Sequence, residues 1–132
     1  MIVVDASVLA NALGDDAADG DAARAALAHQ DLSAPDLVDV ETAAVLRKRW
    51  LAKTMTARRF ALAIDDLQMF PIVRYPALPF LRRAYELRAN VSAYDATYVA
   101  LAEELGCALL TADARLAAAP GIRCPVTILA AP

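Results

Sequence analysis

The sequence predicts an α/β fold in which a short parallel sheet is flanked by helices. Short apolar runs alternate with longer segments whose apolar residues recur at helical spacing. This alternation is typical of parallel strands joined by right-handed helical crossovers. The chain has 132 residues and contains no linker or repeat, so we expect a single domain over residues 1–132.

Short extended segments are expected at five places along the chain. The first, Ile2-Val3-Val4, is β-branched and is expected to form a buried strand. Pro76 ends the third of these segments. The expected extended segments are residues 2–4, 32–34, 72–73, 107–111 and 126–129.

Helices are expected between these segments. Pro35 suits the first turn of a helix, Thr56 is a suitable N-cap, and Gly106 stands where a C-cap glycine belongs. The expected helices cover residues 6–13, 21–30, 35–50, 57–67, 79–88, 93–105 and 112–118.

Composition excludes several classes of protein. Hydrophobic residues make up 59% and charged residues 22% of the chain, which excludes intrinsic disorder. No apolar stretch approaches the roughly 18 residues of a transmembrane helix, and no basic segment precedes the first apolar residues as in a signal peptide. We therefore expect no membrane contact and a cytoplasmic location. Two cysteines are too few for a disulfide framework, and the single histidine, His29, is a poor basis for a catalytic triad.

Two acidic residues follow predicted strands. Asp5 ends the first strand, and Asp113 comes two residues after the strand that ends at Thr111. Both are expected at the carboxyl edge of the sheet, where ligands bind in open α/β folds. Neighbouring carboxylates repel one another unless a cation or a proton intervenes. The net charge of −3 also favours a carboxylate metal site over a general nucleic-acid binder.

Two further acids, Glu41 and Asp95, lie on predicted helices beside apolar residues. An unpaired charge is costly to bury, and a divalent cation would be a suitable partner. Simpler interpretations stay open, however. Asp95 ends an S-x-x-D pattern that favours a helix N-terminus. Asp113 would lie in the first turn of a helix capped by Thr111, and Glu41 would pair with a base one turn further on. Asp5 is the hardest to explain in this way, because aspartate is disfavoured in buried strands.

Four segments resemble the motifs of PIN-domain ribonucleases. Residues 3–9, VVDASVL, resemble the opening motif, and residues 35–41, PDLVDVE, resemble the segment of the second acid. Residues 92–102, SAYDATYVALA, and 110–116, LTADARL, resemble the third and fourth motifs. The motifs occur in order over nearly the whole chain. The length and the last two motifs are most similar to the VapC toxins of bacterial toxin–antitoxin pairs.

The resemblance implies a PIN-like three-layer α/β/α fold and a metal-dependent endoribonuclease that hydrolyses RNA phosphodiester bonds. Asp5, Glu41, Asp95 and Asp113 would be the catalytic residues. Asp5, Asp95 and Asp113 would lie nearest to Mg²⁺, or to Mn²⁺ as the alternative. Glu41 would bind the metal through water or orient the attacking water. A small VapB-like antitoxin would cover the site, and the toxin would form a homodimer.

Other residues are candidates for supporting roles. Three polar residues are expected to bond to the metal-binding carboxylates, although a cap or turn role is open for each: Ser7, Asn11 and Thr111. Lys48 lies seven residues after Glu41 on the same helix face, and Arg115 follows Asp113 closely, so both are candidates for RNA binding. An apolar surface for an antitoxin helix is one interpretation of four residues, with ordinary core as the other: Leu46, Trp50, Met55 and Phe60.

Two other functions remain as alternatives. A receiver domain requires a lysine at the end of a late strand, whereas Lys48 and Lys53 fall in or just after a helix. A phosphatase of the haloacid-dehalogenase type requires a second aspartate two residues after the first, and Ser7 stands there. These departures weigh against another metal-dependent phosphohydrolase on the same sheet. A non-catalytic interaction module is disfavoured because all four acids are present.

Overall fold

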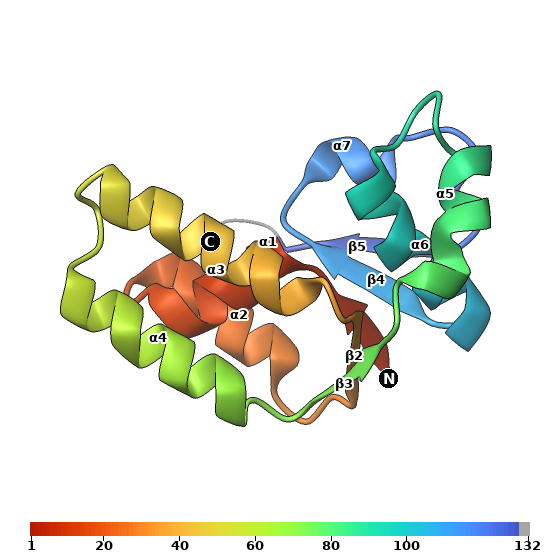
Figure 1. The fold of residues 1–132 in the computed structure, drawn as a ribbon. Helices are drawn as coiled ribbons and strands as arrows, with labels where there is room; N and C mark the ends of the chain where they lie inside the picture. The colour runs from red at the N-terminus through yellow and green to blue at the C-terminus, as the bar shows by residue number, and fades with distance from the viewer. Residues whose placement is uncertain (130–132) are drawn as a thin grey trace.

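Five parallel strands form the sheet of the computed structural model, which describes residues 1–129 (Figure 1). Their order is β3-β2-β1-β4-β5. The strands are β1 Ile2–Val4, β2 Leu32–Pro35, β3 Ile72–Tyr75, β4 Ala108–Thr111 and β5 Val126–Ile128. The prediction of a short parallel sheet is therefore confirmed.

The strand order reverses beside β1. From β1 the chain adds β2 and β3 on one side, and then β4 and β5 on the other. Val4 of β1 pairs with Leu110 of β4 in parallel register, so the carboxyl ends of these two strands lie side by side. In open α/β sheets this switch point is where ligands bind.

The helices lie in two groups around the sheet (Figure 1). Helix α1 packs against α2, α3 and α4. Helix α6 packs against β1, β2 and β4, and α5 packs against α6. The helices are α1 Ala6–Gly14, α2 Ala18–Leu27, α3 Val38–Leu51, α4 Ala57–Met69, α5 Leu81–Glu86, α6 Ala93–Leu105 and α7 Ala114–Ala117, with a 3₁₀ turn η1 at Leu78–Phe80. None of the helices within residues 1–129 is long and apolar enough to cross a membrane.

Several predicted helix ends are confirmed. The side chain of Thr56 accepts a hydrogen bond from the backbone of Arg59 and caps α4. Gly106 ends α6 in the left-handed conformation, with φ of 64°, which glycine adopts without a steric cost. Helix α6 has the predicted bounds because both of its ends carry strong local signals.

Three predicted boundaries are wrong. Pro35 ends β2 and does not begin α3, because the backbone N–H of Asp36 continues the ladder by donating to the Tyr75 carbonyl at 2.7 Å. Helix α2 begins at Ala18 and not at Asp21, since Asp15 Oδ1 accepts from the backbone N–H of Ala17 at 2.7 Å. The segment expected as one helix over residues 79–88 divides into η1 and α5.

The structure favours the core interpretation for most of the four residues considered as an apolar antitoxin surface: Leu46, Trp50, Met55 and Phe60. Leu46 is 0% and Met55 8% exposed, and both belong to the core. Phe60 is partly buried and packs against that core, so only Trp50, at 44%, presents a large exposed apolar side chain. The ordinary core interpretation therefore holds for most of this set.

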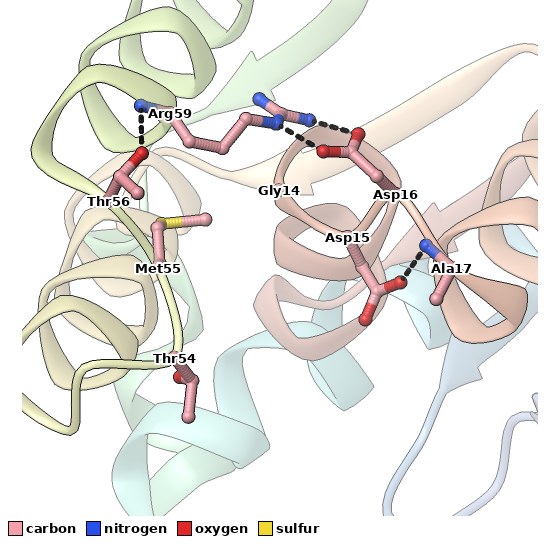
Figure 2. Close-up of a pocket in the computed structure, with 8 residues that line it drawn as sticks. All are labelled: Gly14, Asp15, Asp16, Ala17, Thr54, Met55, Thr56 and Arg59. Carbon is pink, nitrogen blue, oxygen red and sulfur yellow. Dashed lines mark hydrogen bonds and ion pairs between the residues drawn. The ribbon is translucent and has the colours of Figure 1, made fainter.

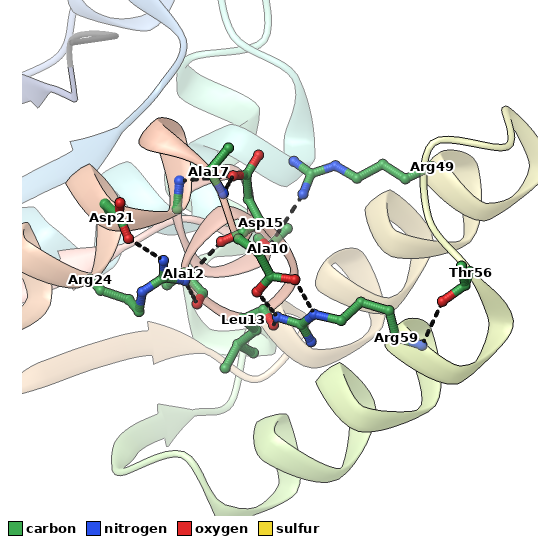
Figure 3. Close-up of polar contacts among 12 residues, drawn as sticks. Ala10, Ala12, Leu13, Asp15, Ala17, Asp21, Arg24, Arg49, Thr56 and Arg59 are labelled. Atoms are coloured by element: carbon green, nitrogen blue, oxygen red, sulfur yellow. Dashed lines mark hydrogen bonds and ion pairs between the residues drawn. The ribbon is translucent and has the colours of Figure 1, made fainter.

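Three arginines from three different helices bond to backbone carbonyls at the end of α1 (Figure 3). They are Arg24 of α2, Arg49 of α3 and Arg59 of α4. Arg24 donates to the carbonyls of Ala12 and Asp15, at 2.9 and 2.8 Å. Arg49 donates to the carbonyl of Ala10 at 3.4 Å, and Arg59 to that of Leu13 at 2.8 Å. The last carbonyls of a helix lack partners within it and carry a partial negative charge. The guanidinium groups therefore fix the end of α1 both electrostatically and geometrically.

We predict that Arg59→Ala lowers the free energy of unfolding by about 2 kcal/mol, the usual worth of a hydrogen bond to a charged group. The lost bonds join Arg59 to Leu13 and Asp16. Urea denaturation measures the change. Arg58→Ala, an exposed neighbour on α4, is the control and should stay within about 0.5 kcal/mol. Equal losses in the two variants would contradict a role of Arg59 in holding α1.

Candidate active site

Four acids approach the carboxyl edge of the sheet from four elements. Asp5 is the N-cap of α1, and Asp113 is the N-cap of α7. Glu41 and Asp95 lie in the first turns of α3 and α6. Asp95 experiences the charges of Asp5 and Asp113, and Glu41 experiences those of Asp95 and Asp5. The structure thus places Asp5, Glu41 and Asp95 within range of one another's charges, and Asp113 within range of the charge of Asp95.

Asp5 is only 7% exposed, and hydrogen bonds satisfy both of its oxygens. Its Oδ1 accepts from the backbone N–H groups of Ser7 and Val8, at 2.9 and 3.3 Å, and from the Ser7 hydroxyl. Its Oδ2 accepts from the hydroxyl of Thr111, which is fully buried. A buried carboxylate is tolerated when donors replace its water, so Ser7 and Thr111 hold this charge in place.

The loop after β4 is tied to the same network. The backbone N–H of Asp113 donates to Thr111 Oγ1 at 3.1 Å, and that of Ala112 donates to Ser7 Oγ at 3.2 Å. Asp113 is therefore placed by the residues that hold Asp5. Thr111 was expected to cap the following helix, but Asp113 does so by accepting from the backbone of Arg115.

Asn11 lies away from this network. Its Oδ1 accepts from Arg49, and no hydrogen bond within residues 1–129 joins it to any of the four acids. Asn11 is on the second turn of α1, nearer the end that the arginines hold. Its expected contribution to the metal-binding carboxylates is therefore not supported by its contacts.

Arg115 forms a bidentate contact with Asp113. Its Nε and Nη2 donate to Oδ1 and Oδ2 of Asp113, each at 3.1 Å. This contact holds the pKa of Asp113 below its usual value. The Arg115 side chain is still 91% exposed, so its guanidinium remains open to a phosphate. Lys48, the other predicted RNA-binding residue, is exposed on α3.

Glu41 has a buried partner that sequence reasoning missed. The hydroxyl of Tyr98, a residue that is 1% exposed, donates to Glu41 Oε1 at 2.7 Å. Burial is the largest cause that raises the pKa of Glu41, followed among the raising causes by the charges of Asp95 and Asp5. One feature of the sequence pointed to Tyr98: it stands three residues after Asp95, on the same face of α6. Its apolar neighbours, however, indicated only a core position.

A cavity of about 280 Å³ opens beside two of the acids. Asp95, Asp113 and Arg115 line it, together with residues 90–92. A larger hollow of about 620 Å³ lies at the other end of α1 (Figure 2). There Arg59 pairs with Asp16 at 2.9 Å, and none of the four acids contributes. The smaller cavity is thus the candidate site, because two of the four predicted acids, Asp95 and Asp113, line it.

The acids fit an open metal site better than a closed one. Within residues 1–129, no three side chains of His, Cys, Asp or Glu are gathered closely enough to enclose an ion. All four candidate ligands are carboxylates, however, and Mg²⁺ is commonly held by one or two carboxylates with several waters. The charges of Asp5 and Asp113 also raise the pKa of Asp95, and a cation would relieve this repulsion.

We predict opposite stability effects for two charge-removing variants. Burial, Asp5 and Asp113 raise the pKa of Asp95, so its stabilising contribution is present at low pH and is lost as the pH rises through that value. Asp95→Asn should therefore raise Tm at neutral pH, and the gain should vanish in acid. The pKa of Asp113 is lowered, so its contribution is present at neutral pH and is lost as the pH falls. Asp113→Asn should lower Tm at neutral pH.

Thermal melts between acidic and neutral pH measure both effects, with the protein in metal-free buffer. A lower Tm for Asp95→Asn at neutral pH would mean that its charge acts chiefly on the N-terminus of α6, as the simpler interpretation held.

We predict that Tyr98→Phe lowers the free energy of unfolding by about 1–3 kcal/mol, because the half-buried Glu41 loses its donor. Tyr94→Phe makes the same chemical change on a residue that is 65% exposed, and should have almost no effect. Urea denaturation of the two variants measures the difference in their free energies of unfolding. Equal stabilities would show that the Tyr98–Glu41 bond is replaced by water at no cost.

Comparisons with known proteins show the family of this chain. The PIN domain model matches residues 2–122. The chain is 43% identical to ribonuclease VapC9 of Mycobacterium tuberculosis over 98% of each chain, and 38% identical to ribonuclease VapC1 of the same organism over 96% of each. Among solved structures, M. tuberculosis VapC20, described as a sarcin-ricin loop cleaving toxin, has a TM-score of 0.72 at 20% identity, covering 93% of this chain and 97% of that one. The chain therefore belongs to the PIN domain family and, within it, to the VapC ribonucleases.

Proposed function

We propose that this protein is a metal-dependent endoribonuclease, the toxin of a toxin–antitoxin pair, and that it hydrolyses RNA at the carboxyl edge of its sheet. One observation carries the proposal. Four carboxylates on separate elements lie within range of the charge of at least one other at the carboxyl edge of the sheet, and two of them, Glu41 and Asp95, have raised pKa values because of burial and of the other acids.

Asp5, Asp95 and Asp113 would hold the ion, which we propose is Mg²⁺ with Mn²⁺ as the alternative. When bound, such an ion lowers the pKa of a coordinated water and offsets charge on the phosphate. Ser7 and Thr111 support this role by fixing both oxygens of Asp5. They also place the loop that carries Asp113, so two of the three ligands would be positioned by one network.

Glu41 is the proposed proton acceptor. Tyr98 bonds to its Oε1, so Oε2 is left to accept a proton from the attacking water. A general base is most effective when its pKa approaches the working pH, and the pKa of Glu41 is raised in that direction. Tyr98 is a positioning residue in this scheme, because it acts on the water only through Glu41.

The substrate and partners follow from the likeness to VapC proteins. Arg115, and more distantly Lys48, would contact the phosphates of the RNA. We propose that a small VapB-like antitoxin covers the carboxylate edge and inhibits cleavage, that the toxin forms a homodimer, and that it acts in the cytoplasm. Since this chain already provides all four acids, the partners would control access and would add no catalytic group.

We predict that Asp5→Asn, Asp95→Asn and Asp113→Asn each abolish most RNA cleavage while circular dichroism shows an intact fold. Each change keeps the shape of the side chain but removes a charge that the cation needs. The assay follows cleavage of total RNA with Mg²⁺ by antitoxin-free protein. Asp65→Asn, an exposed residue of α4, is the control and should cleave normally.

Calorimetry tests the metal separately. Mg²⁺ should bind at millimolar concentration to the unaltered protein and to Asp65→Asn, and more weakly to Asp5→Asn. Full cleavage by Asp95→Asn, or cleavage unaffected by EDTA, would contradict the proposed site.

A further inference from the structure

The arginines and lysines fall into groups according to whether their side chains form ion pairs with acids. Five arginines form ion pairs with acids: Arg24, Arg59, Arg74, Arg83 and Arg115. Arg49 instead bonds to α1. Among the remaining cations of residues 1–129, none has an acid within ion-pair distance. Two of them lie on either side of Tyr85 in the sequence: Arg82 on α5, and Arg88 in the turn that follows α5.

The side chains of Arg82, Tyr85 and Arg88 form a stack. The guanidinium carbon of Arg88 lies 4.0 Å from the centroid of the Tyr85 ring, and that of Arg82 lies 5.7 Å from it. Arg88 Nη1 also donates to the Tyr85 carbonyl at 2.9 Å, which holds it over the ring. Tyr85 is 55% exposed. The stack, Arg82–Tyr85–Arg88, is therefore a preorganised cationic and aromatic surface at the exterior.

The other side of α5 anchors this surface. Ala84 and Leu87 are buried, and Arg83 pairs with Glu103 of α6 at 2.8 Å and 3.0 Å. Arg83 also donates to the Gly121 carbonyl at 2.8 Å. These contacts hold α5 against α6, the helix that carries Asp95. The position of the stack relative to the start of α6 is therefore fixed.

The chain leads directly from the stack to the candidate site. Only three residues lie between Arg88 and Ser92, the N-cap of α6, so their Cα atoms are at most about 15 Å apart. Residues 90–92 line the same cavity as Asp95, Asp113 and Arg115. An RNA strand that occupies this cavity therefore passes close to α5.

We propose that the stack binds an unpaired nucleotide of the RNA substrate next to the cleavage site. Unpaired bases stack on aromatic rings and on arginine planes, and the two guanidinium groups supply charge for the adjoining phosphates. The net charge of −3 gives no general attraction for RNA, so affinity must come from local cations of this kind. This inference rests on the proposed ribonuclease function.

Fluorescence anisotropy tests the proposal with a short single-stranded RNA of mixed sequence, and with the same strand annealed to its complement. Asp95→Asn is the background, so that RNA is not cleaved. Tyr85→Ala should weaken binding of the single strand about tenfold, as expected for one lost base stack, with little effect on the duplex. Tyr85→Phe should retain full affinity. Arg88→Ala should weaken binding by an amount that shrinks as salt rises.

Arg58→Ala is the matched control for loss of one exposed positive charge, on α4 in the other helix group (Figure 1). Tyr85→Ala binding as tightly as Arg58→Ala would overturn the inference, and so would equal losses for single strand and duplex. Unchanged RNA affinity with weaker antitoxin binding would assign the stack to the protein partner and would also overturn it. If the unaltered chain neither cleaves nor binds RNA, the proposed function itself fails, which is a distinct result.

Discussion

Asp5 ends β1, caps α1 and accepts a hydrogen bond from Thr111 of β4, so one carboxylate joins three elements. Its burial would be costly if any of its donors were missing. The N-terminus of α1 adds a partial positive charge next to it. This explains why Ser7 and Thr111 accompany the aspartate: their hydroxyls replace the water that the buried carboxylate loses. The geometry of the carboxylate edge depends on this one set of bonds.

The opposite end of α1 is held as firmly by different chemistry. Arginines from α2, α3 and α4 bond to its final carbonyls, so α1 is fixed at both ends by charges of opposite sign. The arginines contact no acid of the site, so their role is to fix the end of α1 that lies opposite Asp5.

Local signals predicted much of the fold, whereas long-range contacts were not predictable. Thr56 and Gly106 mark helix ends within a few residues of chain, and an aspartate after a β-branched run identified Asp5. Pro35 misled because proline also suits a helix start, and only pairing with β3 decides between the two. The Tyr98–Glu41 hydrogen bond joins residues 57 positions apart in the sequence. The arginine that bonds to Leu13 of α1 is 46 positions away from it in the sequence. No sequence pattern specifies such pairs, since they exist only once the helices have packed.

The distribution of charge reconciles an acidic protein with an anionic substrate. Carboxylates occupy the centre of the edge, where burial and mutual repulsion raise the pKa values of Glu41 and Asp95. Cations stand around them: Arg115 contacts Asp113 while most of its side chain stays exposed, and Arg88 lies a few residues before the N-cap of α6. In the proposed function, these guanidinium groups would attract the phosphates of the RNA strand, and a divalent ion would offset the charge of the acids. The two effects would act on different parts of the strand, so neither would require a positive charge on the protein as a whole.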